Sequence, residues 1–359
     1  MRVEIAEREL EELRARLRAT RLADDFGNDD WRYGVERGWL EGMLRYWADD
    51  YDWRAQEAAI NRHAQHVVEL DGIPVHYMHV PGDGPPLLLT HGWPWTFWDY
   101  AQVVEELAGA FELVVPSLPG FGFSTPLRTT GVHPQRIARL WVQLMRRLGH
   151  DRFAAAGGDW GAIISAELGA HHAEHVTGVY LTMPTYPGID MLALRRAEFA
   201  PDEAWMPERL KQAGRMTRSH STVHSIEPQT LAYALVDSPA GTAAWLWARR
   251  AAWSDGGIEV FDRDFLCTTA SLYWFNRTIG TSLRIYHEHF NRRWEPARIT
   301  VPTGVAVFPK ELVLLPRAVA ERQMDLRRWT VMERGGHFAA AERPREVAAE
   351  LRAFFLDGD

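Results

Sequence analysis

The segment with the clearest chemical potential is Gly157-Gly-Asp-Trp-Gly161, in which a carboxylate stands between glycines. A short alanine-rich run from Phe153 precedes it, and an apolar pattern with helical spacing follows it. This order predicts a strand, a sharp turn and a helix, with Asp159 at the apex of the turn. The glycines fit such a turn because the strand and the helix approach too closely there for Cβ atoms.

A carboxylate at this apex can act as a nucleophile. It is already ionised near neutral pH, so no base has to remove a proton before it attacks. Its natural target is an sp³ carbon that bears a leaving group, and the product is an alkyl-enzyme ester. The simpler alternative is that Asp159 only caps the following helix with its side-chain oxygen. The short motif alone leaves this alternative open.

Two residues downstream could complete a catalytic set with Asp159. Glu311 lies just past the end of one predicted strand, and His337 lies in Gly335-Gly-His-Phe338 after another. Taken singly, the glutamate is most often a solvated charge and the histidine a loop residue. The chain order of nucleophile, acid and histidine is that of the α/β-hydrolase fold, whose nucleophile stands in a Gly-x-Ser-x-Gly elbow. Order and strand context together favour a triad.

The rest of the chain supplies the elements that this fold needs. Two apolar runs joined by Asp71-Gly72 predict a β-hairpin. Strand-like runs then alternate with helical patterns, which predicts a mostly parallel sheet covered on both faces. The predicted strands cover residues 67–70, 73–80, 87–90, 111–115, the run before the elbow, 179–183, 299–308 and 329–332, and the main predicted helices cover 134–148 and 344–356.

This alternation is interrupted once. Between about residues 185 and 297 the chain is rich in Trp, Arg and helical patterns, which suits an inserted helical cap. We therefore predict an α/β-hydrolase core over 66–184 and 298–359, a cap over 185–297, and an N-terminal helical segment over 1–65 that packs on the core. The apolar stripe of that segment could equally form a homodimer contact, although packing on its own chain is the simpler interpretation.

Composition narrows the class of protein. The 359 residues carry a net charge of -8, which argues against nucleic acid or an anionic membrane as the main partner. Cys267 is the only cysteine, so no intrachain disulfide forms, and a reducing compartment is expected. The N-terminus is too polar for a signal peptide, and no apolar run approaches the roughly 18 residues that span a bilayer. We expect a cytoplasmic protein. No Cys/His cluster has metal-ligand spacing, and we expect neither metal nor cofactor.

A series of motifs resembles one family, the epoxide hydrolases of the microsomal and juvenile-hormone type. The resemblance runs in order through nearly the whole chain, and Tyr51-Asp-Trp-Arg-Ala-Gln56 is similar to the family's N-terminal segment. No stretch resembles the membrane anchor of the microsomal members. The other matching motifs are His91-Gly-Trp-Pro94, Pro119-Gly-Phe-Gly-Phe-Ser124, Gly157-Gly-Asp-Trp-Gly161, Asp237-Ser-Pro239, Ser271-Leu-Tyr-Trp274, Pro302-Thr-Gly304, Phe308-Pro-Lys-Glu-Leu312 and Gly335-Gly-His-Phe-Ala-Ala340.

The resemblance implies a role for each triad residue. Asp159 would be the nucleophile, His337 the base that activates water, and Glu311 the acid that orients His337. The backbone N–H groups of Trp93 and Trp160 would form the oxyanion hole for ester hydrolysis. The family also uses two cap tyrosines, which hydrogen-bond the epoxide oxygen and protonate it as the ring opens.

The cap tyrosines are where this sequence departs from the family. One tyrosine matches Tyr286, but the other position falls on His220. His220 can donate as an imidazolium or as a neutral N–H tautomer. As an imidazolium it would make ring opening fall as pH rises through the histidine range. Alternatively, Tyr286 works alone, or a neighbour such as Tyr233 or His224 replaces the missing tyrosine.

A second departure concerns the pocket wall. Trp95 follows the His-Gly-Trp-Pro motif, where a glycine is common in the family, and its ring would narrow or reshape the pocket. We expect Trp95, Trp160 and Phe338 to line the substrate pocket.

The predicted function is hydrolysis of a small hydrophobic epoxide to a vicinal diol, without a cofactor. Two alternatives stay open. A haloalkane dehalogenase uses a similar Asp/His/acid set but needs halide-binding donors, and Tyr286 argues against it. A non-hydrolytic cyclase or ligand-binding protein could keep the same fold, and His220 is the reason to retain that alternative.

Overall fold

A computed structural model describes residues 1–190 and 194–358 of the protein. Eight strands form one sheet with the order β1-β2-β4-β3-β5-β6-β7-β8. β2 pairs antiparallel with β1 and β4, and the other neighbouring strands are parallel. The mostly parallel sheet is therefore confirmed. The strands are β1 (Ala64–Leu70), β2 (Ile73–Val80), β3 (Pro86–Thr90), β4 (Glu112–Pro116), β5 (Phe153–Gly157), β6 (Val176–Leu181), β7 (Ile299–Val307) and β8 (Met324–Val331).

The strand predictions differ from the structure mainly at the edge of the sheet. The hairpin is confirmed, because Leu70 pairs with Ile73 across Asp71 and Gly72, which both have positive φ. β8 begins at Met324, five residues before the predicted start at 329. It is the last strand of the sheet and only half buried, so charged residues interrupt its apolar pattern. The apolar pattern therefore did not predict the first half of β8.

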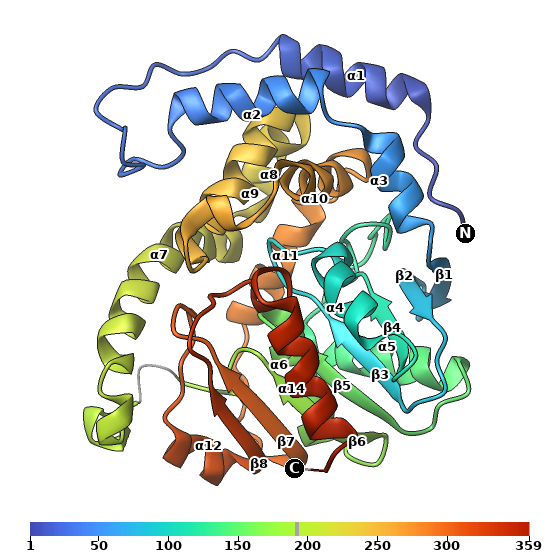
Figure 1. The fold of residues 1–359 in the computed structure, drawn as a ribbon, viewed down its shortest axis with the longest axis vertical. Helices are drawn as coiled ribbons and strands as arrows, with labels where there is room; N and C mark the ends of the chain where they lie inside the picture. The colour runs from blue at the N-terminus through green and yellow to red at the C-terminus, as the bar shows by residue number, and fades with distance from the viewer. Residues whose placement is uncertain (191–193, 359) are drawn as a thin grey trace.

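Helices cover both faces of this sheet (Figure 1). α5 (Pro134–Arg147) packs beside α6 (Trp160–His171) on one face, and α4 (Ala101–Leu107) packs beside α14 (Pro344–Phe355) on the other. The short helices α12 (Arg317–Gln323) and α13 (Ala339–Glu342) complete the core. Parallel strands need such crossover helices, which is why the sheet is buried on both faces.

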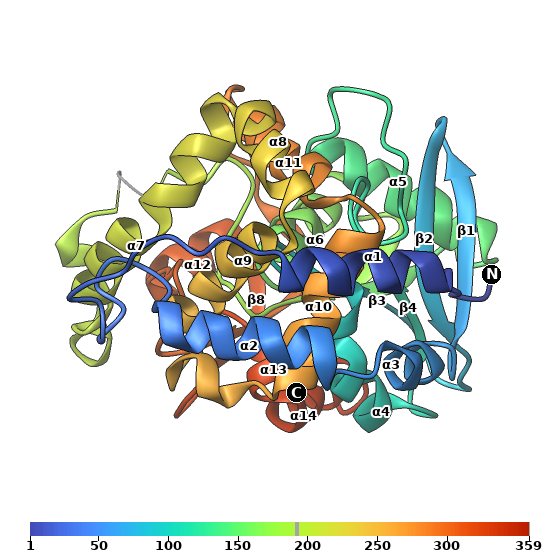
Figure 2. The ribbon, with the colours of Figure 1, turned by 90° about the horizontal axis from the view of Figure 1, so that it is seen from above.

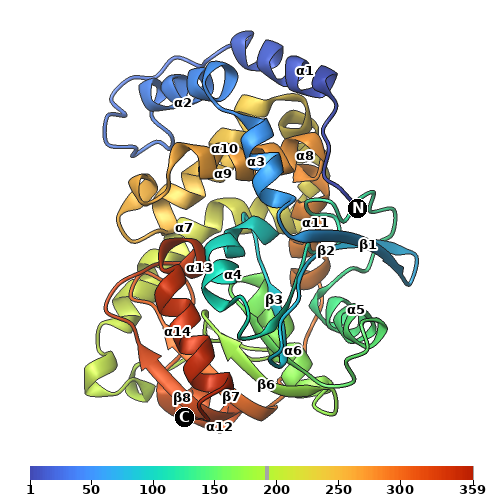
Figure 3. The ribbon, with the colours of Figure 1, turned by 45° about the vertical axis from the view of Figure 1, so that its right-hand side comes forward.

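All regular elements that the structure describes between β6 and β7 are helical, and they form a cap over the carboxyl ends of the strands (Figure 3). Its longer helices are α7 (Met206–Ile226), α8 (Pro228–Asp237), α9 (Pro239–Trp253), α10 (Arg263–Phe275) and α11 (Ile279–Phe290). In the described part of the chain, no helix combines the length and the apolar character that crossing a membrane requires.

The N-terminal segment lies mainly on the cap, not on the core as predicted. Its helices are α1 (Glu7–Arg18), α2 (Arg37–Asp49) and α3 (Trp53–Ile60), and α1 and α2 run across α9 and α10 (Figure 2). Trp47 Nε1 donates to Ser271 Oγ at 3.0 Å, and the Trp39 ring packs edge-on against Trp247. The aromatic stripe of α2 therefore finds its partner surface on the cap helices, which the sequence pattern of the segment alone could not identify.

Candidate active site

Asp159 occupies the sharp turn between β5 and α6. Its φ of 51° and ψ of -126° are strained for a residue with a side chain. A Cβ atom at Gly161 would lie 1.8 Å from Thr90 O, so only glycine allows strand and helix to approach this closely. The Asp159 side chain makes no capping hydrogen bond to α6. The helix-cap alternative is therefore wrong, and the carboxylate is free for another purpose.

A backbone donor holds one oxygen of this carboxylate. Trp93 N donates to Asp159 Oδ1 at 2.6 Å, from the segment that follows β3. A Cβ atom at Gly92 would lie 2.2 Å from the same oxygen, so the preceding glycine keeps the approach open. Trp160 is the first residue of α6, and the first N–H groups of a helix have no partner within it. Its N–H therefore points away from the helix at the same turn.

The structure brings His337 to the other oxygen of Asp159, and Glu311 to the opposite nitrogen of the histidine ring. Glu311 follows β7 and His337 follows β8, so two parallel strands deliver them to the same end of the sheet. His337 Nε2 lies 3.4 Å from Asp159 Oδ2, and His337 Nδ1 lies 2.6 Å from Glu311 Oε1. The histidine and glutamate side chains are buried, whereas Asp159 remains partly exposed. The structure thus brings the three predicted residues together, with His337 between the two carboxylates.

The charge of the histidine depends on its two carboxylate neighbours. Burial alone lowers the pKa of His337, but Glu311 and Asp159 together raise it to about 10. The imidazole between the two carboxylates is therefore protonated at neutral pH.

A cavity of about 500 Å³ opens on the exposed side of Asp159. Asp159, His337, Tyr286 and His220 all line it, and most of its other described walls are apolar. Two hollows of about 620 Å³ each lie elsewhere on the surface and include none of these four residues. Among these three hollows, the one with the most apolar lining is therefore also the one that contains these four titratable residues.

Tyr286 and His220 reach the cavity from different cap helices. Tyr286, on α11, lies with its ring 4.8 Å from the Trp160 ring. His220, on α7, stacks on the Trp93 ring at 5.2 Å and lies 5.3 Å from the ring of Tyr286. The Nδ1 atom of His220 is buried without a hydrogen-bond partner among the described residues. Both side chains thus line the same cavity as Asp159.

Burial sets the protonation state of both groups. It raises the pKa of Tyr286 well above its ordinary value, and the Asp159 carboxylate adds to that effect. Burial also lowers the pKa of His220 well below its ordinary value, assisted by His224 and Arg249. At neutral pH Tyr286 is therefore a phenol and His220 a neutral imidazole.

The two alternative donors lie elsewhere. Tyr233, on α8, is 72% exposed and does not line the cavity. His224 is buried beside Tyr286, but its Nε2 accepts a hydrogen bond from Trp245 Nε1 and it does not line the cavity. Neither residue occupies the position of a second donor.

Two residues that were predicted to line the pocket, Trp95 and Phe338, pack behind the His337 ring and not on the cavity wall. Trp95 and Phe338 are buried and do not line the cavity, whereas Trp160 does. The Trp95 ring lies 5.9 Å from the His337 ring, and a Cβ atom at Gly158 would lie 2.7 Å from it. The prediction for Trp95 and Phe338 was therefore wrong, because the large ring fills the space beneath the turn and not the substrate side.

Sequence analysis missed other residues of the wall. Trp253, at the end of α9, lines the cavity and packs against His337 with ring centroids 5.4 Å apart. Leu210, Gly214, Thr217 and Ser221 line it from one face of α7. Their spacing of three or four residues is the repeat of a helix face, and it would have identified this wall once His220 was placed in the pocket.

Comparisons with known proteins identify relatives of the whole chain. The family model "Epoxide hydrolase N terminus" matches residues 1–100, and the model "alpha/beta hydrolase fold" matches residues 85–218. Epoxide hydrolase 1 of Sus scrofa is 31% identical over 98% of this chain and 87% of its own length. Juvenile hormone epoxide hydrolase of Bombyx mori is 28% identical over 97% of this chain and 84% of its own length.

Solved structures of the same group superpose over almost the whole chain. The crystal structure of juvenile hormone epoxide hydrolase from Bombyx mori covers 98% of this chain and 92% of its own, at 26% identity and a TM-score of 0.90. The epoxide hydrolase of Aspergillus niger covers 99% and 94%, at 28% identity and a TM-score of 0.84. The sheet order, the elbow and these relatives lead to one conclusion: the chain has the α/β-hydrolase fold and belongs to the epoxide hydrolases of the microsomal and juvenile-hormone type.

Proposed function

We propose that the protein converts a hydrophobic epoxide to a vicinal diol through an alkyl ester on Asp159. One observation carries the proposal: the two oxygens of Asp159 have different partners, a backbone N–H on Oδ1 and the base on Oδ2. A carboxylate so held can attack with one oxygen and develop negative charge on the other. Membership of the epoxide hydrolase family favours this reaction over haloalkane dehalogenation and over a non-hydrolytic binder.

In the first step Asp159 Oδ2 attacks a ring carbon and the carbon–oxygen bond of the epoxide breaks. The leaving oxygen takes a proton from Tyr286 or His220, which face the cavity above the nucleophile. Both are neutral donors, so the product carries a hydroxyl group on the alkyl ester and the donor is left as an anion. The burial that raises the pKa of Tyr286 keeps its proton in place until the alkoxide develops.

In the second step water attacks the ester carbon of Asp159. Esterification removes the charge on Asp159, and with it one of the interactions that raise the pKa of His337. His337 can then return its proton to the donor that lost one in the first step, and serve as the base that takes a proton from water. The negative charge develops on Oδ1, where the N–H groups of Trp93 and Trp160 are available. Collapse expels the alkoxide, which takes the remaining proton of the attacking water, so the diol leaves and the carboxylate is restored.

Oxygen labelling tests this sequence of bonds. In a single turnover of styrene oxide by excess enzyme in H₂¹⁸O, we expect an unlabelled diol, because its new oxygen comes from Asp159. The label should appear on the peptide that contains Asp159, by mass spectrometry after digestion. Labelled diol in the first turnover would mean that water attacks the epoxide directly, and the ester would have to be abandoned.

The walls of the cavity support a lipophilic substrate. Among its described lining residues, the charged or titratable side chains are Asp159, His337, His220, Tyr286 and the exposed Lys211, and the others are mainly apolar or small. The proposed steps use protein groups and water only, so they require neither a metal nor a cofactor. A cytoplasmic location and a homodimer stay predictions, which cell fractionation and analytical ultracentrifugation can check.

Glu311→Gln should slow ester hydrolysis more than ring opening. Its carboxylate lies 2.6 Å from His337 Nδ1 and raises the pKa of the base, which favours the imidazolium that forms during water attack. Ring opening does not use that proton. Burst kinetics should therefore show a larger build-up of alkyl-enzyme than in the wild type. Equal slowing of both phases would remove Glu311 from the proposed role.

A further inference from the structure

The segment that carries the Trp93 N–H, residues 91–99, is held by the cap. We call this segment the oxyanion loop; it runs from the end of β3 into a 3₁₀ helix over Phe97–Tyr100. Asp99, at its end, is fully buried and forms an ion pair of 2.8 Å with Arg250 of α9. The Arg250 side chain is only 1% exposed. Burying both charges away from water costs free energy. Such a pair, which joins two segments far apart in the sequence, therefore points to a role in holding these segments together.

Asp99 divides its two oxygens between the loop and the cap. Oδ2 accepts from Thr96 N at 2.8 Å and so closes the turn that follows Trp95. Oδ1 accepts from Arg250 Nη2 at 2.8 Å. One carboxylate therefore fixes the conformation of the loop and ties it to α9 at the same time.

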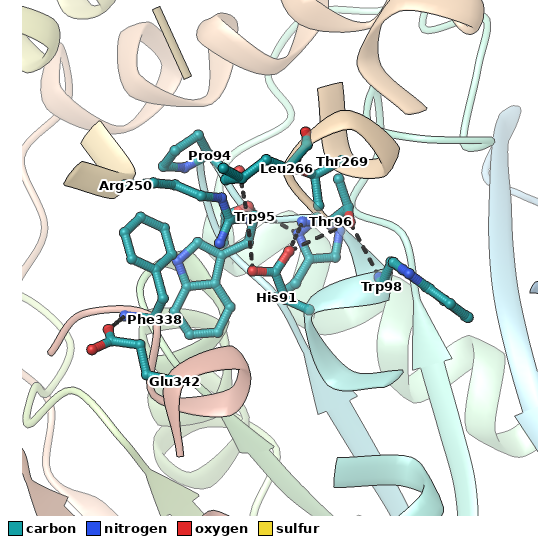
Figure 4. Close-up of polar contacts among 12 residues, drawn as sticks. His91, Pro94, Trp95, Thr96, Trp98, Arg250, Leu266, Thr269, Phe338 and Glu342 are labelled. Atoms are coloured by element: carbon teal, nitrogen blue, oxygen red, sulfur yellow. Dashed lines mark hydrogen bonds and ion pairs between the residues drawn. The ribbon is translucent and has the colours of Figure 1, made fainter. Parts of the chain in front are cut away.

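Arg250 also reaches the loop next to the donor itself. The same Nη2 lies 3.4 Å from the carbonyl oxygen of Pro94, the residue that follows Trp93. Figure 4 shows the Arg250 side chain beside Pro94, Trp95 and Phe338. A second cap helix adds to the attachment, because Tyr273 OH of α10 donates to Trp95 O at 2.8 Å. The carbonyl groups directly after the oxyanion donor are thus held by side chains of the cap.

The last turn of α9 also contacts the loop that carries His337, which we call the histidine loop. His337 N donates to Trp253 O at 3.0 Å, three residues after Arg250. The guanidinium carbon of Arg250 lies 4.5 Å from the centre of the Phe338 ring, which is within the range of a cation–π contact. One turn of one cap helix therefore sets both the oxyanion loop and the histidine loop.

We propose that Arg250 and Asp99 are positioning residues, which hold the Trp93 N–H where the ester oxygen develops its negative charge. This inference rests on the proposed function, because the N–H acts on the ester. An oxyanion donor is effective only at hydrogen-bond distance from the developing charge, and a misplacement of about 1 Å can reduce a rate about 10²-fold. The pair should therefore matter for ester hydrolysis more than for ring opening, which depends on the cap donors.

The test must avoid leaving a buried charge unpaired, because a single substitution would destabilise the fold for that reason alone. The double variant Arg250→Met/Asp99→Asn removes both charges, and the asparagine oxygen can still accept from Thr96 N. The matched control is Arg328→Met/Glu350→Gln, which removes an ion pair of 2.8 Å between β8 and α14, elements that carry none of the oxyanion loop. Formation and decay of the ester on Asp159 are measured by rapid quench and intact-protein mass spectrometry in single turnovers.

We expect the double variant to form the ester at close to the wild-type rate and to hydrolyse it about 10²-fold more slowly. The control variant should keep the wild-type ratio of the two rates. Arg250→Lys keeps a charge for Asp99 but replaces the rigid planar guanidinium, whose Nη2 contacts both Asp99 and Pro94 O, with a compact ammonium on a flexible stem, so its hydrolysis rate should fall between those of the wild type and the double variant. This conservative variant decides the question if the double variant does not fold.

Several results would overturn the inference. One is a folded double variant, by circular dichroism and Tm, that hydrolyses the ester at the wild-type rate. Another is equal slowing of formation and decay, which would indicate a general structural role. If the double variant does not fold, a wild-type ratio of ester formation to ester hydrolysis in Arg250→Lys would overturn the inference as well. A wild-type enzyme that forms no ester on Asp159 would instead overturn the proposed function itself, so the two failures are distinguishable.

Discussion

Replacing His337 with glutamine should trap the enzyme after its first half-reaction. Asp159 keeps its carboxylate and its access to the cavity, so the ester should still form. Glutamine cannot take a proton from water at neutral pH, and loss of a positioned general base typically costs about 10²–10⁴-fold. Intact-protein mass spectrometry after mixing with an aryl epoxide should show the protein mass increased by the mass of one substrate. Digestion should place the added mass on the peptide that contains Asp159.

The trapping experiment has a matched control at the nucleophile. Asp159→Asn fills the same turn with an uncharged side chain and should give no added mass under the same conditions. The mechanism would be refuted if His337→Gln consumed substrate over many turnovers without any added mass. An adduct on a different carboxylate would keep an ester mechanism but move it away from the elbow.

Removing the proton donors should have the second large effect, this time on ring opening. Opening an epoxide develops an alkoxide, and a positioned acid contributes about 10²–10⁴-fold. Tyr286→Phe deletes a buried phenol over the nucleophile, and we expect the single-turnover rate of ester formation to fall within that range. His220→Phe should lower the same rate, and the double substitution should lower it further. Decay of the ester should change little in all three variants, because the donors act before it.

The protonation state of His220 gives this prediction a pH signature. Since burial lowers the pKa of His220 well below its ordinary value, the side chain stays neutral as pH rises through the usual histidine range. A neutral N–H donor therefore predicts no loss of ring opening from this group between about pH 5 and 8. The descending limb expected for an imidazolium donor should be absent, and His220→Tyr should have the same profile as the wild type.

His224→Gln is the control for the His220 variants. His224 lies one turn further along α7, is buried and does not line the cavity, and glutamine can still accept the hydrogen bond from Trp245. Its rate of ester formation should stay near that of the wild type. If His220→Phe also left that rate unchanged, Tyr286 would be the only donor. If Tyr286→Phe were equally harmless, proton donation from the cap would have to be rejected.

Several features of this protein were predictable from sequence because they depend on local patterns. The Gly-x-Asp-x-Gly turn predicted a strained elbow, since its glycines are required by backbone contact alone. Alternating apolar runs predicted the buried strands, and they failed at β8 because an edge strand has no continuous apolar pattern. The chain order of Asp159, Glu311 and His337 and their places after predicted strands together predicted that these residues lie close to one another, since parallel strands deliver their carboxyl ends to one edge of the sheet.

Tertiary structure alone decided the features that depend on contacts between distant segments. The aromatic stripe of α2 could be covered by any apolar surface, and only the packed chain shows that α9 and α10 cover it. Trp95 is a large aromatic residue of the type that lines pockets. In the structure, however, its ring lies in the space beside Gly158, which has no side chain, and therefore behind His337. The ion pair of Asp99 and Arg250 joins residues 151 positions apart, and no local pattern predicts it. Sequence thus determined which groups could react, whereas long-range packing determined what holds them in place.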